Sequence, residues 1–162
     1  MNRRQSCLGL AGVGIVAQAA SPSLFAAPPV RSQESPKVRW FQSLRAAHKL
    51  AIEQDVPLLI VFGASWCTYC HKMDREVFGD KRVISLIERE FIPVHLDYDR
   101  DIKVAKILEV EKLPCTVILS PHADLLAKRE GYAQIPEFQK ILTTALSRQA
   151  EIPQVKDSSS IR

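Results

Sequence analysis

The chain has 162 residues, of which 46% are hydrophobic and 25% charged, and its net charge is +4. This length and composition suit one globular domain with an ordinary core. Arg3 and Arg4 are the only charged residues among the first 27, so removal of this segment would lower the net charge from +4 to +2. A nearly neutral chain without a basic block excludes a protein that binds nucleic acid through its charge.

The N-terminal residues have the layout of a secretory signal peptide, predicted here to be residues 1–27. The two arginines precede an apolar run at 8–17, which is too short to span a bilayer, and small residues with cleavage sites near 19–20 or 26–27 follow. Export predicts a periplasmic or otherwise oxidising location for the mature chain, where disulfides persist.

The remaining sequence predicts a linker, one domain and a tail. Residues 28–36 are rich in Pro, Ser, Gln and Glu and predict a linker, whereas the polar residues 150–162 predict a flexible tail. Residues 37–149 form the expected domain.

The order of the predicted elements within this domain gives an α/β sandwich with a central sheet. The run at 58–62 is wholly apolar, as in a strand buried on both faces. The predicted elements are, in order, a short strand at 38–41, a helix at 43–54, a strand at 58–62, helices at 67–78 and 80–90, a strand at 91–98, a helix at 99–110, a hairpin of strands at 115–119 and 124–129, and a helix at 135–148.

Two cysteines lie directly after the buried strand, in the segment Cys67-Thr68-Tyr69-Cys70. A strand that delivers a Cys-x-x-Cys pair to a helix N-terminus is typical of dithiol–disulfide chemistry. The helix terminus favours an anion, which makes Cys67 the expected nucleophilic thiolate. Cys70, one turn deeper, is the expected resolving thiol that attacks the mixed disulfide.

Two other functions also fit this cysteine-containing segment. Cys67-x-x-Cys70-His71 also spells the attachment sequence for c-type haem, with His71 as the proximal ligand of an electron carrier. Against this, Met73 is the only methionine left after processing and lies too close to His71 to reach the opposite haem face. Cys67, Cys70, His71 and Cys115 could instead form a Cys/His metal-binding module.

The segment Gly63-Ala64-Ser65-Trp66-Cys67, followed by Met73, Val77-Phe78 and Val83, is similar to secreted thioredoxin-like domains. These include the C-terminal domain of the periplasmic electron-transfer protein DsbD. A second match is the Val110-x-x-x-Pro114 pattern, and the resemblance spans about residues 37–148. The resemblance implies a thioredoxin fold, with a central mixed β-sheet flanked by helices, and a thiol–disulfide oxidoreductase without a cofactor or metal. The residues before Cys67 resemble the reducing branch of the family.

The resemblance also implies partners and contact residues. The partners are protein thiols or disulfides and an upstream electron donor, for which a membrane thiol reductase is a candidate. Pro114 matches the family's cis-proline, which presents backbone to an extended substrate. The expected substrate-contact residues are Trp66, Thr68, Tyr69, Leu113 and Pro114.

Two positions depart from the family pattern. Cys115 stands where threonine usually follows the cis-proline; if the fold is right, its sulfur could lie close to the redox pair, although a buried inert thiol is favoured over an accessory redox or metal-binding thiol. Val61 stands where thioredoxins carry a buried aspartate that accepts the proton of the second cysteine. His71 and His95 are the candidates that could replace it through water, although a surface or packing role is the commoner one for histidine.

Overall fold

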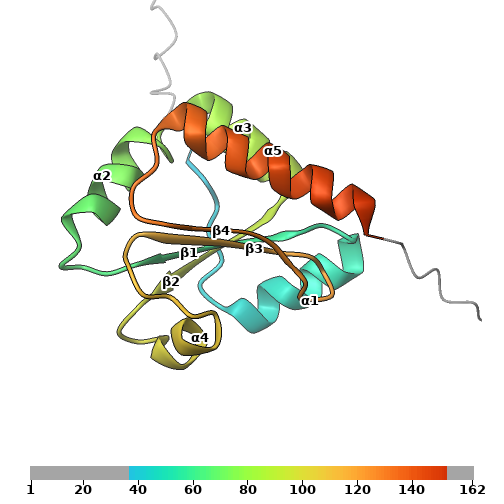
Figure 1. Ribbon diagram of the computed structural model, residues 1–162, viewed down its shortest axis with the longest axis horizontal. Coiled ribbons are helices and arrows are strands. Elements are labelled where there is room, and N and C mark those ends of the chain that lie inside the picture. The colour runs from blue at the N-terminus through green and yellow to red at the C-terminus, as the bar shows by residue number, and fades with distance from the viewer. Residues whose placement is uncertain (1–36, 153–162) are drawn as a thin grey trace, which may run out of the picture. The chain divides into compact units, whose positions relative to one another are not determined.

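A four-stranded mixed sheet lies at the centre of the protein, with the strand order β2-β1-β3-β4 (Figure 1). The structure is a computed structural model and describes residues 37–152. Its elements are α1 (Leu44–Gln54), β1 (Leu58–Gly63), α2 (Thr68–Glu76), α3 (Lys81–Glu90), β2 (Ile92–Asp97), α4 (Ile102–Ile107), β3 (Cys115–Leu119), β4 (Leu125–Glu130) and α5 (Ile135–Glu151).

The sheet confirms the predicted α/β class. β1 pairs in parallel with β2 and antiparallel with β3, and β3 and β4 form the predicted hairpin. β1 is buried along its whole length, as its unbroken apolar run predicts. β1 is therefore an inner strand, with β2 on one side and β3 on the other. These two neighbours fix the end of β1, from which the chain continues to Cys67.

Helices cover both faces of the sheet (Figure 1). On one face, α2, α3 and α5 pack over Leu59 and Val61 of β1. On the other face, α1 and α4 pack over the alternate residues of β1, which include Phe62. Because side chains alternate along a strand, these two faces of β1 contribute to separate parts of the core.

The strand predicted at 38–41 is absent apart from a single bridge between Phe41 and Val94. The backbone N–H of Arg39 donates instead to the Glu88 carboxylate over 2.6 Å, and the guanidinium of Arg39 pairs with the same side chain. A side chain therefore takes the backbone donor that a strand ladder would need.

The helix predicted at 99–110 is shorter, because α4 covers only Ile102–Ile107. The preceding residues form a turn in which the Asp97 carboxylate accepts the backbone N–H groups of Asp99 and Arg100. Aspartate side chains compete in this way with helical hydrogen bonds, so they delay the helix start.

At the C-terminal end, α5 extends through residue 151 and includes the first two residues of the predicted tail. Residues 153–162 lie outside the described part of the chain, as do the predicted signal peptide and linker. Within residues 37–152, no helix has both the length and the apolar character needed to cross a membrane.

Candidate functional site

Cys67 is the N-cap residue of α2, as the sequence predicts. Its backbone is extended (φ −88°, ψ 101°), and its sulfur accepts a hydrogen bond from the Cys70 backbone N–H over 3.2 Å. The unpaired N–H groups and the dipole of a helix start favour negative charge at this position. The local geometry therefore suits a thiolate on Cys67 when the pair is reduced.

Cys67 and Cys70 form a disulfide, with their Cα atoms 5.3 Å apart. Both residues are mostly buried, at 6% and 5% exposure, and cluster with Ala64. Tyr98 and Leu113 pack against this cluster from the turn after β2 and the loop before β3. Leu113 was predicted at the site, whereas Tyr98 was not, because no motif marks it.

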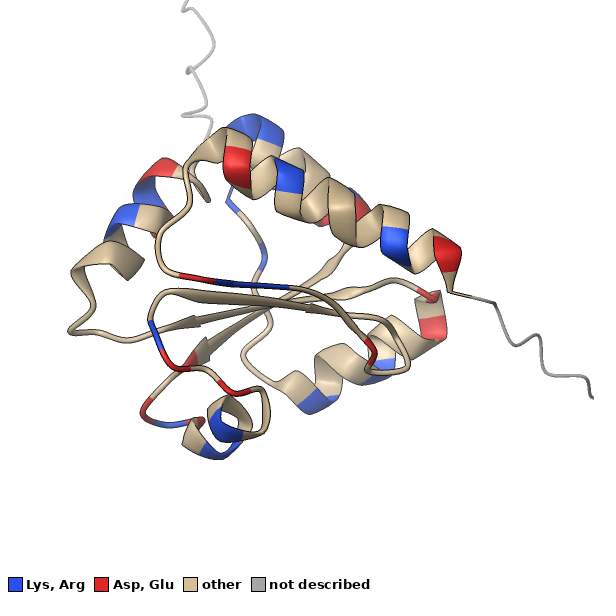
Figure 2. Cartoon of the chain, viewed as in Figure 1, with Lys and Arg blue, Asp and Glu red and all other residues tan. Residues whose placement is uncertain are grey.

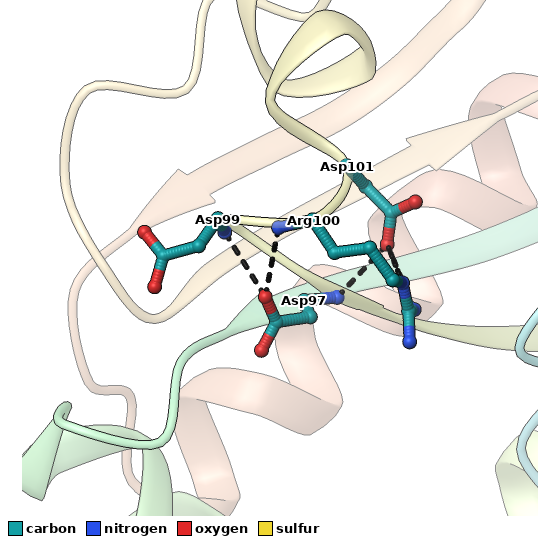
Figure 3. Close-up of polar contacts among 4 residues, drawn as sticks. All are labelled: Asp97, Asp99, Arg100 and Asp101. Atoms are coloured by element: carbon teal, nitrogen blue, oxygen red, sulfur yellow. Dashed lines mark hydrogen bonds and ion pairs between the residues drawn. The ribbon is translucent and has the colours of Figure 1, made fainter.

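Trp66 lies beside the disulfide but is 64% exposed, so it is not part of the core. Its indole Nε1 donates a hydrogen bond to Asp99 over 2.8 Å. Asp99 lies in the turn that the Asp97 side chain stabilises, and the Asp101 carboxylate accepts from the Asp97 backbone and the Arg100 guanidinium (Figure 3). This hydrogen-bonded turn holds the carboxylate that orients Trp66.

Thr68 and Tyr69 are exposed residues of the first turn of α2. The Tyr69 ring lies 6.4 Å from the ring of Tyr132, which precedes α5. The Tyr132 hydroxyl donates to Glu76 over 2.6 Å, and this hydrogen bond raises the pKa of Tyr132. The exposed ring of Tyr69 and the partly buried ring of Tyr132 therefore continue from the Cys-x-x-Cys segment toward the start of α5.

The Leu113–Pro114 peptide bond is cis, as predicted. Pro114 is buried, and its carbonyl accepts a hydrogen bond from the Gly131 backbone N–H over 2.8 Å. Because Leu113 packs against the redox cluster, the loop that carries this bond lies beside the disulfide. The contact of Leu113 and Pro114 with a substrate stays a prediction.

Cys115 is fully buried and pairs across the sheet with Phe62. Its side chain belongs to the core on the α1 and α4 face and is not part of the cluster formed by Cys67 and Cys70. Burial raises its pKa to about 11, so the thiol is neutral at pH 7. The structure thus places Cys115 as the buried thiol that the sequence favours and not within the redox cluster.

The two candidate histidines have different surroundings. His71 is exposed, and its Nε2 donates to the Ser65 carbonyl over 2.8 Å, so its ring braces the loop before Cys67. His95 lies on β2 as the register partner of Val61, and its Nε2 is 3.9 Å from a carboxylate oxygen of Asp74. Burial lowers the pKa of His95, and the negative charge of Asp74 partly opposes this.

The described residues form neither the alternative metal-binding site nor the alternative haem site. Residues 37–152 contain no group of three or more His, Cys, Asp or Glu side chains placed to hold a metal ion, so Cys67, Cys70, His71 and Cys115 do not form the suggested metal-binding module. Haem attachment would consume both sulfurs of the Cys-x-x-Cys pair. Here these sulfurs bond to each other, and the His71 ring bonds to the Ser65 carbonyl.

The chain around the disulfide carries little charge. Residues 64–71 include no Lys, Arg, Asp or Glu, and neither do the inner strands β1 and β3 (Figure 2). Charged residues lie mainly on the helices, on β4 and in the turn after β2. Stabilisation of a Cys67 thiolate therefore comes from the backbone at the start of α2 and not from an adjacent cationic side chain within this segment.

Comparison with known proteins agrees with this geometry. DsbJ, a thioredoxin-related protein of Chlamydia pneumoniae, is 24% identical over 61% of this chain and 31% of its own length, so the chain spans about a third of that relative. A thioredoxin from Thermus thermophilus is similar in structure, with a TM-score of 0.65, 24% identity, and 70% and 91% of the two chains covered. DsbH oxidoreductase matches with a TM-score of 0.61, 15% identity, and 78% and 95% covered.

These likenesses show the fold, and the likeness to DsbD stays a prediction. The sequence matches the thioredoxin-like domain family over residues 44–146, which is more than half of the chain and includes every element from α1 to most of α5. The matched region contains the Cys67–Cys70 disulfide at the start of α2. The chain therefore belongs to the thioredoxin-like domain family.

Proposed function

We propose that this chain is an exported thiol–disulfide oxidoreductase that reduces disulfides in other proteins, with Cys67 as the nucleophile and Cys70 as the resolving thiol. The observation that carries the proposal is the position of Cys67, which caps α2 and is bonded to the residue one turn further along. A helix N-terminus lowers the pKa of a capping thiol and so increases its thiolate fraction near neutral pH.

The reaction is two successive thiol–disulfide exchanges. The Cys67 thiolate attacks one sulfur of the substrate disulfide, which forms a mixed disulfide and releases the first substrate thiolate. Cys70 then loses its proton and attacks the Cys67 sulfur, which releases the second substrate thiolate and forms the Cys67–Cys70 disulfide. Two electrons pass to the substrate, and an upstream dithiol donor must return the pair to its reduced form.

Activity is tested by reduction of insulin with dithiothreitol as the donor. The wild type should accelerate it, Cys67→Ser should abolish the acceleration, and Cys70→Ser should accumulate a mixed disulfide that gel electrophoresis detects without reductant. Cys115→Ala is the matched control, because this thiol lies in the core on the other face of the sheet, and it should leave the rate unchanged. A wild type no faster than dithiothreitol alone would refute the proposal.

The direction of electron flow is tested by the redox potential of the pair. The residues before Cys67 resemble the reducing branch of the family, so the potential in glutathione or dithiothreitol buffers should lie below about −200 mV. A value close to about −120 mV, as in a strong oxidant, would reverse the proposed direction.

Export and the partners belong to the same proposal. Residues 1–27 supply the features of a cleaved signal, and the partners are protein disulfides and an upstream donor such as a membrane thiol reductase. N-terminal sequencing of protein purified from a periplasmic fraction should find a start near residue 20 or 27. Full-length protein confined to the cytoplasm would contradict export.

A further inference from the structure

Formation of the Cys67–Cys70 bond requires a place for the Cys70 proton. Cys70 is 5% exposed, so bulk water has little access to it. On the face of the sheet that α2 covers, the nearby β1 residue is Val61, which is also buried and cannot accept a proton. If the proposed reaction holds, another side chain near Cys70 has to take up this proton at neutral pH.

His95 and Cys70 lie near each other at the end of β1. Gly63, the last residue of this strand, has no side chain to fill the space between them. A side chain at Gly63 would begin 3.1 Å from His95 Cε1, 3.4 Å from His95 Nε2 and 3.7 Å from Cys70 Cβ. The Cε1–Nε2 edge of the imidazole and the Cys70 side chain therefore border the same small space. A basic nitrogen at this place can reach the Cys70 thiol through one water molecule.

The position of His95 follows from the sheet register. His95 pairs with Val61 in the parallel β1–β2 ladder, so it presents its ring on the same face as that residue, toward α2. Trp40 stacks edge-on against the ring with centroids 5.5 Å apart, and Asp74 of α2 lies 3.9 Å from Nε2. One strand thus supplies the imidazole, and α2 supplies both Cys70 and the carboxylate.

We propose that His95, with the Asp74 carboxylate 3.9 Å from its Nε2, is the proton acceptor for Cys70 and takes the role for which Val61 has no carboxylate. This inference rests on the proposed function. Neutral His95 takes the proton from the Cys70 S–H, and the resulting Cys70 thiolate breaks the bond between Cys67 and the substrate sulfur. The Asp74 carboxylate stabilises the imidazolium, which passes the proton to water. When the pair is reduced again, His95 takes a proton from water and passes it to the Cys70 thiolate.

The surroundings of His95 suit a base that is neutral at pH 7. Burial lowers its pKa, Arg100 acts in the same direction, and the carboxylates of Asp74 and Asp97 oppose them. Lys37 and Arg75 line a cleft that His95 and Asp74 also line. This cleft, which Trp40 and Phe78 also line, gives the His95 ring contact with solvent, so a proton taken from Cys70 can leave.

The test is the pH dependence of the resolving step, followed by stopped-flow after the reduced protein has formed a mixed disulfide with a small aromatic disulfide. His95→Gln should slow this step at pH 7 by about 100-fold, the lower end of what a positioned base contributes. The rate should recover above about pH 9, where hydroxide deprotonates the thiol. The first step, attack by Cys67, should be unchanged.

Two further variants and one control keep the test decisive. Asp74→Asn removes a charge that raises the pKa of His95, so the rising limb of the pH profile should move to lower pH. Gly63→Ala should slow the resolving step because its methyl group displaces the imidazole. His122→Gln is the matched control and should leave the profile unchanged, since His122 is exposed in the turn between β3 and β4.

The two possible failures are distinguishable. If the wild type exchanges disulfides and His95→Gln has the same resolving rate at every pH, the assignment of His95 is wrong while the proposed function stands. If the wild type forms no mixed disulfide at all, the proposed function itself fails. A folded Asp74→Asn variant with an unshifted pH profile would also overturn the role of the His95–Asp74 pair, even where His95→Gln does not fold.

Discussion

The indole N–H of Trp66 donates a hydrogen bond to the carboxylate of Asp99, 33 positions further along the chain, over 2.8 Å. This contact joins the loop before Cys67 to the turn after β2. An aromatic side chain that is exposed yet already oriented loses little freedom when a partner binds, which favours binding. The Trp66–Asp99 pair therefore belongs to the expected substrate-contact surface.

Removal of the Asp99 carboxylate should weaken substrate binding without affecting the thiols. We expect Asp99→Ala to raise KM for a disulfide-containing peptide about two- to tenfold, the range for one hydrogen bond, with kcat unchanged. Steady-state kinetics with varied peptide measures this. Asp99→Asn keeps an accepting oxygen and should stay close to the wild type; equal KM values for all three proteins would remove Asp99 from the surface.

Asp97 should matter for the stability of the turn that carries Asp99. Its carboxylate accepts the backbone N–H groups of Asp99 and Arg100 at 3.1 and 2.9 Å (Figure 3). Asp97→Ala leaves both donors without this partner and should lower the free energy of unfolding by about 1–2 kcal/mol in urea titrations. Asp97→Asn, which retains one acceptor oxygen, should lose less, and an unaffected Asp97→Ala protein would show that water replaces the carboxylate at no cost.

Replacement of Gly79 and of Gly131 by alanine should lower the free energy of unfolding for two different reasons. A Cβ at Gly79 would lie 2.5 Å from the Arg75 carbonyl oxygen, so the backbone must shift, at a cost of about 1–3 kcal/mol. Gly131 has open space around it but a φ of +80°, so Gly131→Ala should cost about 1 kcal/mol through backbone strain alone. Gly131→Asn should cost less than Gly131→Ala because asparagine tolerates this conformation. Denaturation midpoints of the three variants measure these differences, and Gly79→Ala with wild-type stability would contradict the packing described.

Cys115 should make the protein less stable in alkali. Burial raises its pKa from 9.0 to about 11, so the folded state holds the proton more tightly than the unfolded state. Its contribution is fully present below about pH 9 and is lost as pH rises through about 11, a change of up to about 3 kcal/mol at 1.36 kcal/mol per pH unit.

The comparison with Cys115→Ala isolates this effect from other groups that titrate in the same range. The variant should be less stable at pH 7, because it leaves a small cavity, but its stability should fall less steeply between pH 9 and 11. Parallel pH profiles for the two proteins would show that the thiol does not titrate within the core.

The elements that the sequence predicts well are those with strong local signals. The apolar run from Leu58 onward has no polar residue to place on a surface, so it can only be an inner strand. Cys67 follows that strand and precedes a helical pattern, which fixes it at a helix start. The family match adds the cis bond at Pro114, which local sequence alone does not determine.

The parts that the sequence misses depend on pairing between distant segments. Parallel register cannot be read from two strands separately, so nothing in the sequence shows that His95 faces the same side as Val61. The sequence also places Cys115 next to Pro114 but does not show which face of β3 its side chain takes. Similarly, the short α4 results from hydrogen bonds of Asp97 that compete with the helix and that helical periodicity does not reveal.

The position of Cys115 has a consequence for how the chain acquires its disulfide. If the chain is exported and loses residues 1–27, as proposed, the thiols that remain are Cys67, Cys70 and Cys115. They allow three pairings, two of which would trap Cys115 with Cys67 or Cys70. Once β3 is in register beside β1, Cys115 lies in the core on the other face, and only a one-residue slip would turn it over. Folding before oxidation thus selects the active pair, whereas a Cys115-linked species marks a molecule that was oxidised while unfolded.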